Sequence, residues 1–276
     1  MNETLIIEPR KQQTLRLKEL FRYKDLLYFM VLRDVTVQYK QSILGFAWAV
    51  INPFFSMVVF SIIFGKLANV PSNGIPYPIF SYVAMLPWSY FSGSLTGSTS
   101  SLISKANMLS KVYFPRIIIP LTPAFSKLVD FAVSFVILFF MMAYYRISPN
   151  VNMVFLPYLI LLMFLTATGI GMWFSALAIQ YRDIKFAMTF VEKILMYLAP
   201  VVFPASLIQD KFGHTIYLLY GLYPMSGVIE GFRSCLIGKN PMPWDLLGIG
   251  SGVALVIFFT GILYFRKMER VFADVA

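Results

Sequence analysis

The pattern of apolar and charged positions shows a long uncharged stretch early in the chain. From Ser42 to Gly65 no charged residue occurs over 24 consecutive positions, which exceeds the ~20 apolar residues that a helix needs to cross a bilayer. Lys40 stands just before the stretch, at the expected water boundary. Pro53 lies inside it and removes a backbone donor, so a kink is expected. The pattern predicts a first membrane span over about residues 42–66.

Five further apolar stretches follow, separated by short segments rich in Gly, Pro or charged residues. The six predicted spans cover about residues 42–66, 79–101, 117–145, 153–179, 187–203 and 246–265. The second span is unusual, because nine Ser or Thr residues fall between Ser81 and Ser101. Small and hydroxylated residues allow helices to pack closely in membranes. This helix is expected either to be surrounded by protein or to turn a polar face toward a lumen.

The segment before the first span, residues 1–41, is polar at first and then amphipathic. Between about residues 18 and 38, charged residues fall mainly on one side of a helix and Leu27, Val31 and Val35 fall on the other. Such a stripe predicts an interface helix that lies along the membrane surface. The alternative is a simple basic anchor that keeps the N-terminus on the inside.

Residues 207–237 are apolar enough to suggest a seventh span, but Gly213, Gly221 and Pro224 interrupt them. Two helical pieces of about a dozen residues each are too short to cross a bilayer. Such a pair can form a re-entrant hairpin when it is buried in protein. The pattern therefore predicts a re-entrant helical hairpin between the fifth and sixth spans.

The distribution of basic residues favours six spans over seven. With six, the inside segments carry eight, three, three and three Lys or Arg residues, and the outside segments carry five. A seventh crossing would move Arg266, Lys267 and Arg270 to the outside, against the positive-inside rule. We therefore expect six spans with both termini in the cytoplasm.

The composition agrees with an all-α integral membrane protein. The chain is 58% hydrophobic and 13% charged, whereas a soluble domain has about 25% charged residues. A net charge of +10 would suggest a nucleic-acid partner for a soluble protein. Here the basic residues stand beside apolar spans, so they follow topology and no nucleic-acid partner is expected. Cys235 is the only cysteine, which excludes an internal disulfide.

The sequence carries no recognisable machinery for catalysis. Neither Gly65-Lys66 nor Gly238-Lys239 has the upstream glycine that a phosphate-binding loop requires. His214 is the only histidine and there is no cysteine cluster, so no metal site is expected. We expect a chain that is not an enzyme and binds no cofactor of its own.

Charged residues within the predicted spans are the remaining candidates for function. Lys127 and Asp130 lie one helical turn apart in the third span, where they form either a functional site or a self-satisfied pair that fixes helix packing. Glu230 and Arg233 have the same spacing in the predicted hairpin and need a polar environment there. Glu192 fits a position near a span boundary.

Aromatic residues make up 17% of the chain. Interfacial belts and lipid-facing positions explain most aromatic residues in membrane proteins. An aromatic-lined conduit for sugars is the alternative, because the apolar face of a sugar ring stacks on a flat aromatic ring. The residue pattern by itself leaves both interpretations open.

Several motifs occur in one order along the chain. They are LRDVTVQYKQSILGFAWAVINPFFSMVVFSIIFG, GIPYPIF, LPW, SLISKANMLSKVYFPR, YRDI, the EGFR of residues 230–233 and the terminal ERVFADVA. From about residue 30 to the end, the chain resembles the membrane subunit of bacterial ABC-2-type polysaccharide exporters. The FADV ending is most similar to the O-antigen lipopolysaccharide branch, and the capsule and teichoic-acid exporters are the alternatives.

The resemblance implies an architecture and a function. Such permeases have six helices with a re-entrant pair between the fifth and the sixth. They form a homodimer that pairs with two copies of a separate ABC ATPase subunit, which binds the ATP and Mg²⁺. The implied substrate is an undecaprenyl-diphosphate-linked polysaccharide, moved from the cytoplasm to the periplasm across the bacterial inner membrane.

The resemblance also implies roles for particular residues. The polymer path would lie at the dimer seam, bordered by the first and fifth helices, which selects Trp48 and Tyr197 as lining residues. Glu230 and Arg233 are predicted to form a structural clasp of the hairpin on the periplasmic side. The alternative is that they border the substrate path, with Arg233 contacting the diphosphate or sugar during exit. The interface helix, the 105–116 loop and the YRDI motif would meet the ATPase. The residues assigned to that coupling are Lys105, Lys111, Tyr113, Pro115, Arg116, Arg182 and Asp183.

Two other functional classes compete with the exporter. An ion-coupled transporter would need acidic or histidine relays through several spans, and only Asp130 lies clearly within one. A membrane-embedded transferase acting on lipid-linked sugars would need a cluster of carboxylates or histidines at one membrane face. The 13 acidic residues are mostly scattered at span boundaries, which disfavours it.

Overall fold

The computed structural model describes residues 21–40, 45, 47–109, 114–148, 150–181 and 183–269. Within these residues the chain is helical and has no β-strand, so the predicted all-α class is confirmed. The elements in chain order are α2 (Lys24–Lys40), α3 (Ala47–Phe60), the π-helical η1 (Ser61–Leu67), α4 (Tyr77–Ser104), α5 (Ala106–Leu109), α6 (Ile118–Tyr144), the 3-10 helix η2 (Val151–Phe155), α7 (Leu156–Gln180), α8 (Ile184–Leu198), α9 (Ser206–Phe212), α10 (His214–Tyr220), α11 (Pro224–Leu236) and α12 (Trp244–Met268).

Each of the six predicted spans coincides with a helix, but within the described residues only four helical stretches have both the length and the hydropathy to cross a membrane. These four are Ala47–Leu67, Ile118–Tyr144, Val151–Gln180 and Trp244–Met268. The helix α8 has 15 residues and is about 22 Å long, which is shorter than a bilayer core of about 30 Å. The helix α4 has 28 residues and no charge, so its shortfall is in hydropathy. The count of six crossings stays a prediction.

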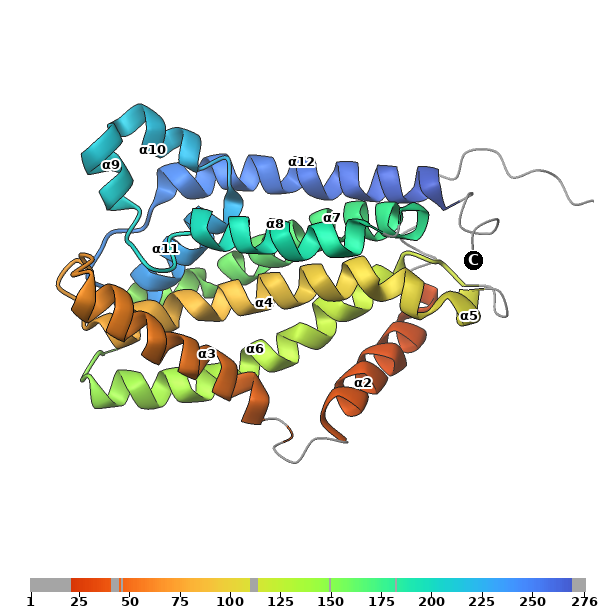
Figure 1. Cartoon of the computed structure of the whole chain (residues 1–276), viewed down its shortest axis with the longest axis horizontal. Helices are drawn as coiled ribbons and strands as arrows, with labels where there is room; N and C mark the ends of the chain where they lie inside the picture. Colours follow the sequence, from red (N-terminus) through yellow and green to blue (C-terminus); the bar gives the residue numbers. More distant parts are fainter. Residues whose placement is uncertain are drawn as a thin grey trace, which may run out of the picture.

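The helix α4 is the centre of the bundle, with α6 and α7 packed along it (Figure 1). Most of its residues are buried. Ser98 donates a hydrogen bond from Oγ to Pro120 O of α6 at 2.7 Å, and a Cβ on Gly97 would lie 2.8 Å from Pro123 Cβ. Its small and hydroxylated residues therefore serve close packing, as the sequence allowed, while Ser89 and Ser92 border a cavity described below.

An apolar cluster packs several elements together at one end of the bundle. Its buried residues include Met30 of α2, Leu102 of α4, Phe114 in the segment before α6, and Phe265 of α12. Figure 1 shows α5 and the end of α12 at the same end of the molecule. This end is the one predicted to face the cytoplasm.

The helix α2 begins near residue 24 and packs on α6. Val31 and Val35, predicted on the apolar side, are partly buried, and Arg33 is exposed. The apolar Val37 is also exposed, at 66%, so α2 presents apolar as well as charged groups outside the bundle. Its position along a membrane surface stays a prediction.

The segment after α8 forms three short helices, α9, α10 and α11, at the opposite end of the bundle (Figure 1). The sequence suggested two pieces; the structure has three because Gly213, at φ +84°, separates α9 from α10. Pro224 is the first residue of α11. An N–H at this position would have no acceptor within the helix, so a proline costs no helical hydrogen bond there. All 13 residues of α11 are buried. Re-entry of this segment into a membrane stays a prediction.

Candidate functional site

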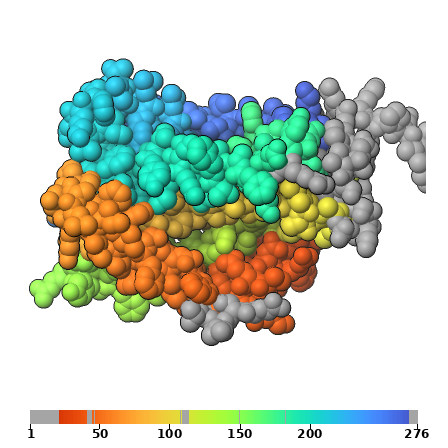
Figure 2. Space-filling view, viewed as in Figure 1, coloured from red at the N-terminus to blue at the C-terminus, as the bar shows by residue number. Residues whose placement is uncertain are grey.

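A cavity of about 400 Å³ lies between α3, α4, α6 and α8. Figure 2 shows it as a hollow between α3 (orange) and α8 (teal), with green atoms of α6 at its floor. Its aromatic lining comes from Trp48, Trp88, Tyr90 and Phe131. The polar side chains that line it are Gln38, Asn52, Ser56, Ser89, Ser92, Lys127, Asp130 and Ser134. The site thus combines flat rings with hydroxyl and amide groups, and its two charges have opposite sign.

The two aromatic residues predicted to line a path lie differently. Trp48, at the start of α3, lines the cavity and is 45% exposed. Tyr197 of α8 is 73% exposed and is not part of the cavity lining, although its neighbour Met196 is. Trp88, for which the sequence pattern indicated no role, also lines the cavity and lies in the LPW motif beside the helix-interior Pro87.

Two side chains at the end of α2, Gln38 and Tyr39, form hydrogen bonds with the Lys127–Asp130 pair of α6. Lys127 Nζ lies 2.8 Å from Asp130 Oδ2, so the pair neutralises itself. The hydroxyl of Tyr39 donates to Asp130 Oδ1, and Gln38 Nε2 donates to Oδ2 at 3.2 Å. Lys127 Nζ also donates to Gln38 Oε1 at 3.1 Å. The four side chains connect α2 to the middle of α6, and three of them, Gln38, Lys127 and Asp130, form part of the cavity wall.

The start of α3 is held to α6 through a backbone carbonyl. Pro53 has no N–H, so the helical hydrogen bond to the carbonyl of Ala49 cannot form. Ser134 Oγ lies 2.9 Å from Ala49 O and donates to it; the same hydroxyl is 2.9 Å from Asp130 O of its own helix. The proline therefore opens α3 at a point where α6 supplies the missing donor.

Glu192 is bonded to α4 rather than standing free at a boundary. Ser92 donates to its Oε1, and Thr96 Oγ1 donates to its Oε2 at 3.1 Å. The bonds link α8 to the hydroxyl-rich side of α4 next to the cavity. The boundary interpretation missed this because the two donors lie 100 and 96 positions away from Glu192 in the chain.

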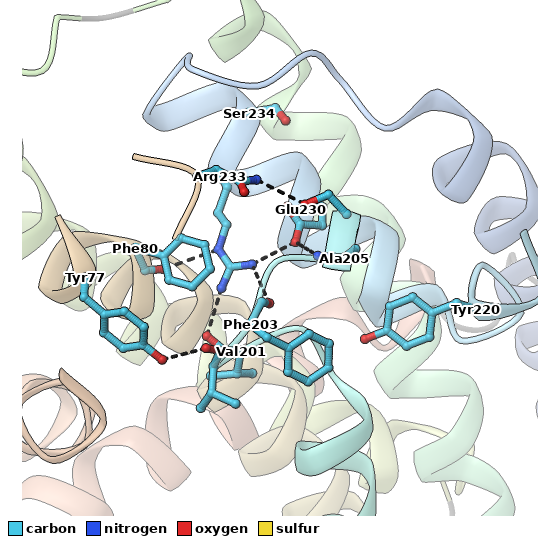
Figure 3. A network of polar contacts seen from close by, with 12 residues as sticks. Tyr77, Phe80, Val201, Phe203, Ala205, Tyr220, Glu230, Arg233 and Ser234 are labelled. Carbon is cyan, nitrogen blue, oxygen red and sulfur yellow. Dashed lines mark hydrogen bonds and ion pairs between the residues drawn. The ribbon is translucent and has the colours of Figure 1, made fainter. Parts of the chain in front are cut away.

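Arg233 and Glu230 form the centre of a buried polar network (Figure 3). Arg233 Nη1 lies 2.9 Å from Glu230 Oε1, which also accepts a hydrogen bond from the Ala205 N–H at 2.7 Å. Arg233 Nη2 donates to Val201 O at 2.8 Å, and Nη1 donates to Phe203 O at 3.3 Å. The Arg233 side chain thereby holds the irregular segment after α8 against α11.

The same guanidinium also reaches α4. Arg233 Nε donates to Phe80 O at 3.4 Å, and the guanidinium carbon stands 3.6 Å from the centre of the Phe80 ring, a cation–π geometry. Arg233 is 1% exposed, so no polymer could touch it in this conformation. Glu230 is 7% exposed and borders a second cavity.

The residues assigned to coupling with an ATPase are only partly described. Lys111, Tyr113 and Arg182 lie outside the described residues. Lys105 is 8% exposed and forms an ion pair with Asp34 of α2, at 2.9 Å between Nζ and Oδ2. The structure thus joins the start of the 105–116 loop to the interface helix.

The far side of that loop is joined to a different helix. Arg116 Nη1 donates to Glu269 O, just after α12, at 2.7 Å. Pro115 stands beside Arg116 and is partly buried. Asp183 is exposed at the start of α8 and makes no side-chain cap there.

Among the described residues, no group of three or more His, Cys, Asp or Glu side chains could hold a metal ion.

Comparison with known families decides the class of the protein. Residues 25–236 match the family described as ABC-2 type transporter, which is well over half of the chain. The chain belongs to the ABC-2 type transporter family. The resemblance seen in the sequence is thereby confirmed. Membership of this family implies a membrane setting and an ABC ATPase as partner.

The transporter is similar to three curated proteins over nearly its full length. The O-antigen export system permease protein RfbA of Myxococcus xanthus is 25% identical over 259 residues, 93% of this chain and 97% of that protein. The protein of the same name from Klebsiella pneumoniae is 26% identical over 91% of this chain and 95% of its own length. The polysialic acid transport protein KpsM of Escherichia coli is 19% identical over 87% and 92%.

The family match covers most of the site geometry in this transporter. The cavity, the α2–α6 contacts and the Arg233 network all lie within residues 25–236. The helix α12 follows beyond the matched range. The site therefore belongs to the part of the chain that carries the family resemblance.

Proposed function

We propose that this chain is the permease subunit of an ATP-driven exporter of polysaccharide, with O-antigen as the polymer. The polymer would be linked to undecaprenyl diphosphate and would move from the cytoplasm to the periplasm across the bacterial inner membrane. The observation that carries the proposal is the cavity between α3 and α8, because its lining suits sugars. The near full-length similarity to two O-antigen export permeases supports the choice of polymer.

The cavity offers what a passing glycan needs. Trp48 and Trp88 supply flat apolar rings, and Asn52, Ser56 and Ser89 supply hydrogen-bonding groups. Binding sites of this kind use aromatic walls for contact area and a few polar groups for orientation. The hydroxyls of a sugar can both donate and accept, so amide and hydroxyl groups suit many sugars equally well. A polymer of repeating sugars could therefore move along such a lining without tight binding at one unit.

The proposed architecture has six crossings and a homodimer. We expect α4 to cross as well, since it has 28 residues, or about 42 Å, and is enclosed by protein rather than lipid. The shorter α8 is included because the family resemblance implies six crossings. The dimer seam would bring together the exposed aromatic residues of α3 and α8, including Trp48, Phe55, Phe190 and Tyr197. The segment from α9 to α11 would re-enter the membrane from the periplasmic side, with both termini in the cytoplasm.

The partner in this proposal is an ABC ATPase in two copies, which carries ATP and Mg²⁺. It would meet the transporter at α2, the 105–116 loop and the start of α8. Two contacts support transmission from there: Lys105 to Asp34 of α2, and Gln38 and Tyr39 to Asp130 of α6. A force on the loop would thus reach the cavity wall through α2.

A capsule polymer is the second candidate, favoured by the similarity to the polysialic acid transport protein, although the identity is lower. Teichoic acid, ion-coupled transport and transferase activity have no supporting observation in the site.

Deletion of the gene, followed by fractionation of the cells, tests the function. Lipid-linked polymer should accumulate at the cytoplasmic face, and a plasmid copy should restore polymer at the surface. A tagged copy should also co-purify with an ABC ATPase. Unchanged polymer distribution in the deletion strain would overturn the proposal. A polymer identified chemically as capsule rather than O-antigen would select the second candidate.

A further inference from the structure

A second cavity, of about 400 Å³, lies at the end of the bundle formed by α9, α10, α11 and the start of α12. Under the proposed orientation this end faces the periplasm. The cavity is separate from the one between α3 and α8, and the two share no lining residue. Its exposed rim includes Asn73, Gln209, Trp244 and Asp245, so a molecule outside the bundle can reach it.

The walls of this cavity are fixed by contacts between different segments. Asn73 Nδ2 lies 3.3 Å from Ser206 Oγ and donates to it, which joins the loop before α4 to α9. Ser234 Oγ donates to Pro241 O at 2.9 Å, which joins α11 to the loop before α12. Lys239 Nζ donates to the carbonyl of Gly74. The cavity is therefore formed before any ligand arrives.

One wall of the cavity carries a buried carboxylate, Glu230, that can accept further hydrogen bonds. Glu230 Oε1 accepts from Arg233 and from the Ala205 N–H (Figure 3). Among the described residues, no hydrogen bond reaches Glu230 Oε2, although the residue is only 7% exposed. Tyr217 of α10 lines the same cavity, and its phenol carries a hydroxyl that can donate. The cavity therefore combines a hydroxyl donor, Tyr217, with two carboxylate acceptors, Glu230 and Asp245.

The charges of the lining exclude one class of ligand. Glu230 and Asp245 are acidic, and none of the described Lys or Arg residues lines the cavity. The guanidinium of Arg233 is enclosed and is occupied by Glu230 and backbone carbonyls. A diphosphate or an acidic polymer would meet net negative charge and no cationic partner. The lining favours an uncharged ligand that is rich in hydroxyls.

The polar groups match such a ligand. Carboxylates accept from sugar hydroxyls, while the amides of Asn73, Gln209 and Asn240 both donate and accept. Trp244 is 51% exposed and borders the cavity, with its ring held edge-to-face against Phe155 at 5.0 Å between centroids. An exposed, fixed indole beside paired donors and acceptors provides the stacking surface that a pyranose ring requires.

We propose that this cavity is an exit subsite that binds a neutral segment of the exported glycan as it leaves the membrane. The inference rests on the proposed export function for its orientation and for the source of the glycan. Binding here would favour forward movement, because a segment held outside opposes the return of the chain.

Photo-crosslinking in export-active cells tests the subsite with the cell's own polymer as the probe. A photoreactive phenylalanine analogue would replace Gln209, which lines the cavity, or Lys211, which is exposed on the same short helix and does not line it. The tagged permease is then purified and stained for carbohydrate. We expect a glycan adduct at position 209 and little at 211. A strain that makes no polymer should give neither.

A second variant pair separates binding from folding. Trp244→Ala should lower the adduct at position 209 by about tenfold, which corresponds to about 1.4 kcal/mol of lost contact. Trp244→Phe retains a ring and should restore most of it. Both variants should keep the normal amount of permease in the membrane and the normal ATPase co-purification.

Three outcomes would overturn the subsite. They are equal adducts at positions 209 and 211, an adduct with protein instead of glycan at 209, and no adduct in cells that export polymer normally. Failure of the export function would be visible separately, as an unchanged polymer distribution in the deletion strain.

Discussion

Ser134 of α6 donates a hydrogen bond to the carbonyl of Ala49 in α3, at 2.9 Å between Oγ and O. This carbonyl is the one that Pro53 leaves without its helical donor. Ala49 is partly buried, and backbone carbonyls shielded from water usually have a partner, so the serine replaces the hydrogen bond that the proline removes. The contact holds the start of α3, and with it Trp48, against the floor of the cavity.

The first prediction concerns this contact. Ser134→Ala should lower the free energy of unfolding by about 0.5–1.5 kcal/mol, because a partly buried carbonyl loses its hydrogen bond. In a Pro53→Ala background the penalty should shrink, since the introduced alanine would supply the helical N–H. Thermal unfolding of the four proteins in detergent measures the cycle. Ser100→Ala is a matched control, because Ser100 bonds only within its own helix. An equal penalty in both backgrounds would contradict the account.

The second prediction compares two aromatic residues. Trp48 lines the cavity, whereas Tyr197 is more exposed and does not. Trp48→Ala should therefore shorten or reduce exported polymer more strongly than Tyr197→Ala. Polymer length on the cell surface, resolved by gel electrophoresis, provides the measurement. If Tyr197→Ala is equally damaging while the complex stays intact, the polymer follows the dimer seam rather than this cavity.

The third prediction concerns the link between the 105–116 loop and α2. Lys105→Glu should place a carboxylate against Asp34 and push the loop away from α2, since like charges repel. Polymer export should fall while the ATPase still co-purifies and hydrolyses ATP. The exchange Lys105→Glu with Asp34→Lys restores opposite charges and should recover part of the export.

The control for this pair is Lys66→Glu, which changes an exposed charge in η1, away from the proposed ATPase contacts. It should have a smaller effect on coupling. Export that is normal in Lys105→Glu, or not improved in the exchange, would show that this ion pair has no part in transmission.

The sequence predicted local features, but it did not predict contacts between residues that lie far apart in the chain. Apolar stretches identified the positions of helices at all six predicted spans, and the helix ends near Gly213 and Pro224 followed from backbone chemistry. The spacing of Glu230 and Arg233 correctly indicated that the two could meet. These are properties of residues within a few positions of one another.

The remaining features depend on tertiary packing. Tyr39 meets Asp130 from 91 positions away, and no periodicity in either helix specifies that contact. The nine hydroxylated residues of the second span were ambiguous for the same reason. The structure divides them between close packing on α6 and the cavity wall, and only the positions of the neighbouring helices decide which residue does which.

The final prediction concerns the Arg233 network. Arg233→Gln removes the donors for Val201 O, Phe203 O and Phe80 O and leaves Glu230 as a buried, unpaired charge. Loss of one partner of a buried ion pair typically costs about 3–5 kcal/mol. Glu230→Gln should cost less, because Arg233 retains its three carbonyl acceptors and an amide oxygen can replace one carboxylate oxygen. Thermal unfolding and polymer export should both follow this order.

The double variant distinguishes a joint role from separate ones. With both residues changed to Gln, no buried charge remains, so the loss of stability should be smaller than the sum of the two single losses. Arg233→Lys is the matched control: it retains the charge but not the planar fork that reaches several acceptors at once. It should therefore remain destabilised. Additive losses, or a fully functional Lys variant, would show that Arg233 is not the clasp that holds the segment after α8 to α4 and α11.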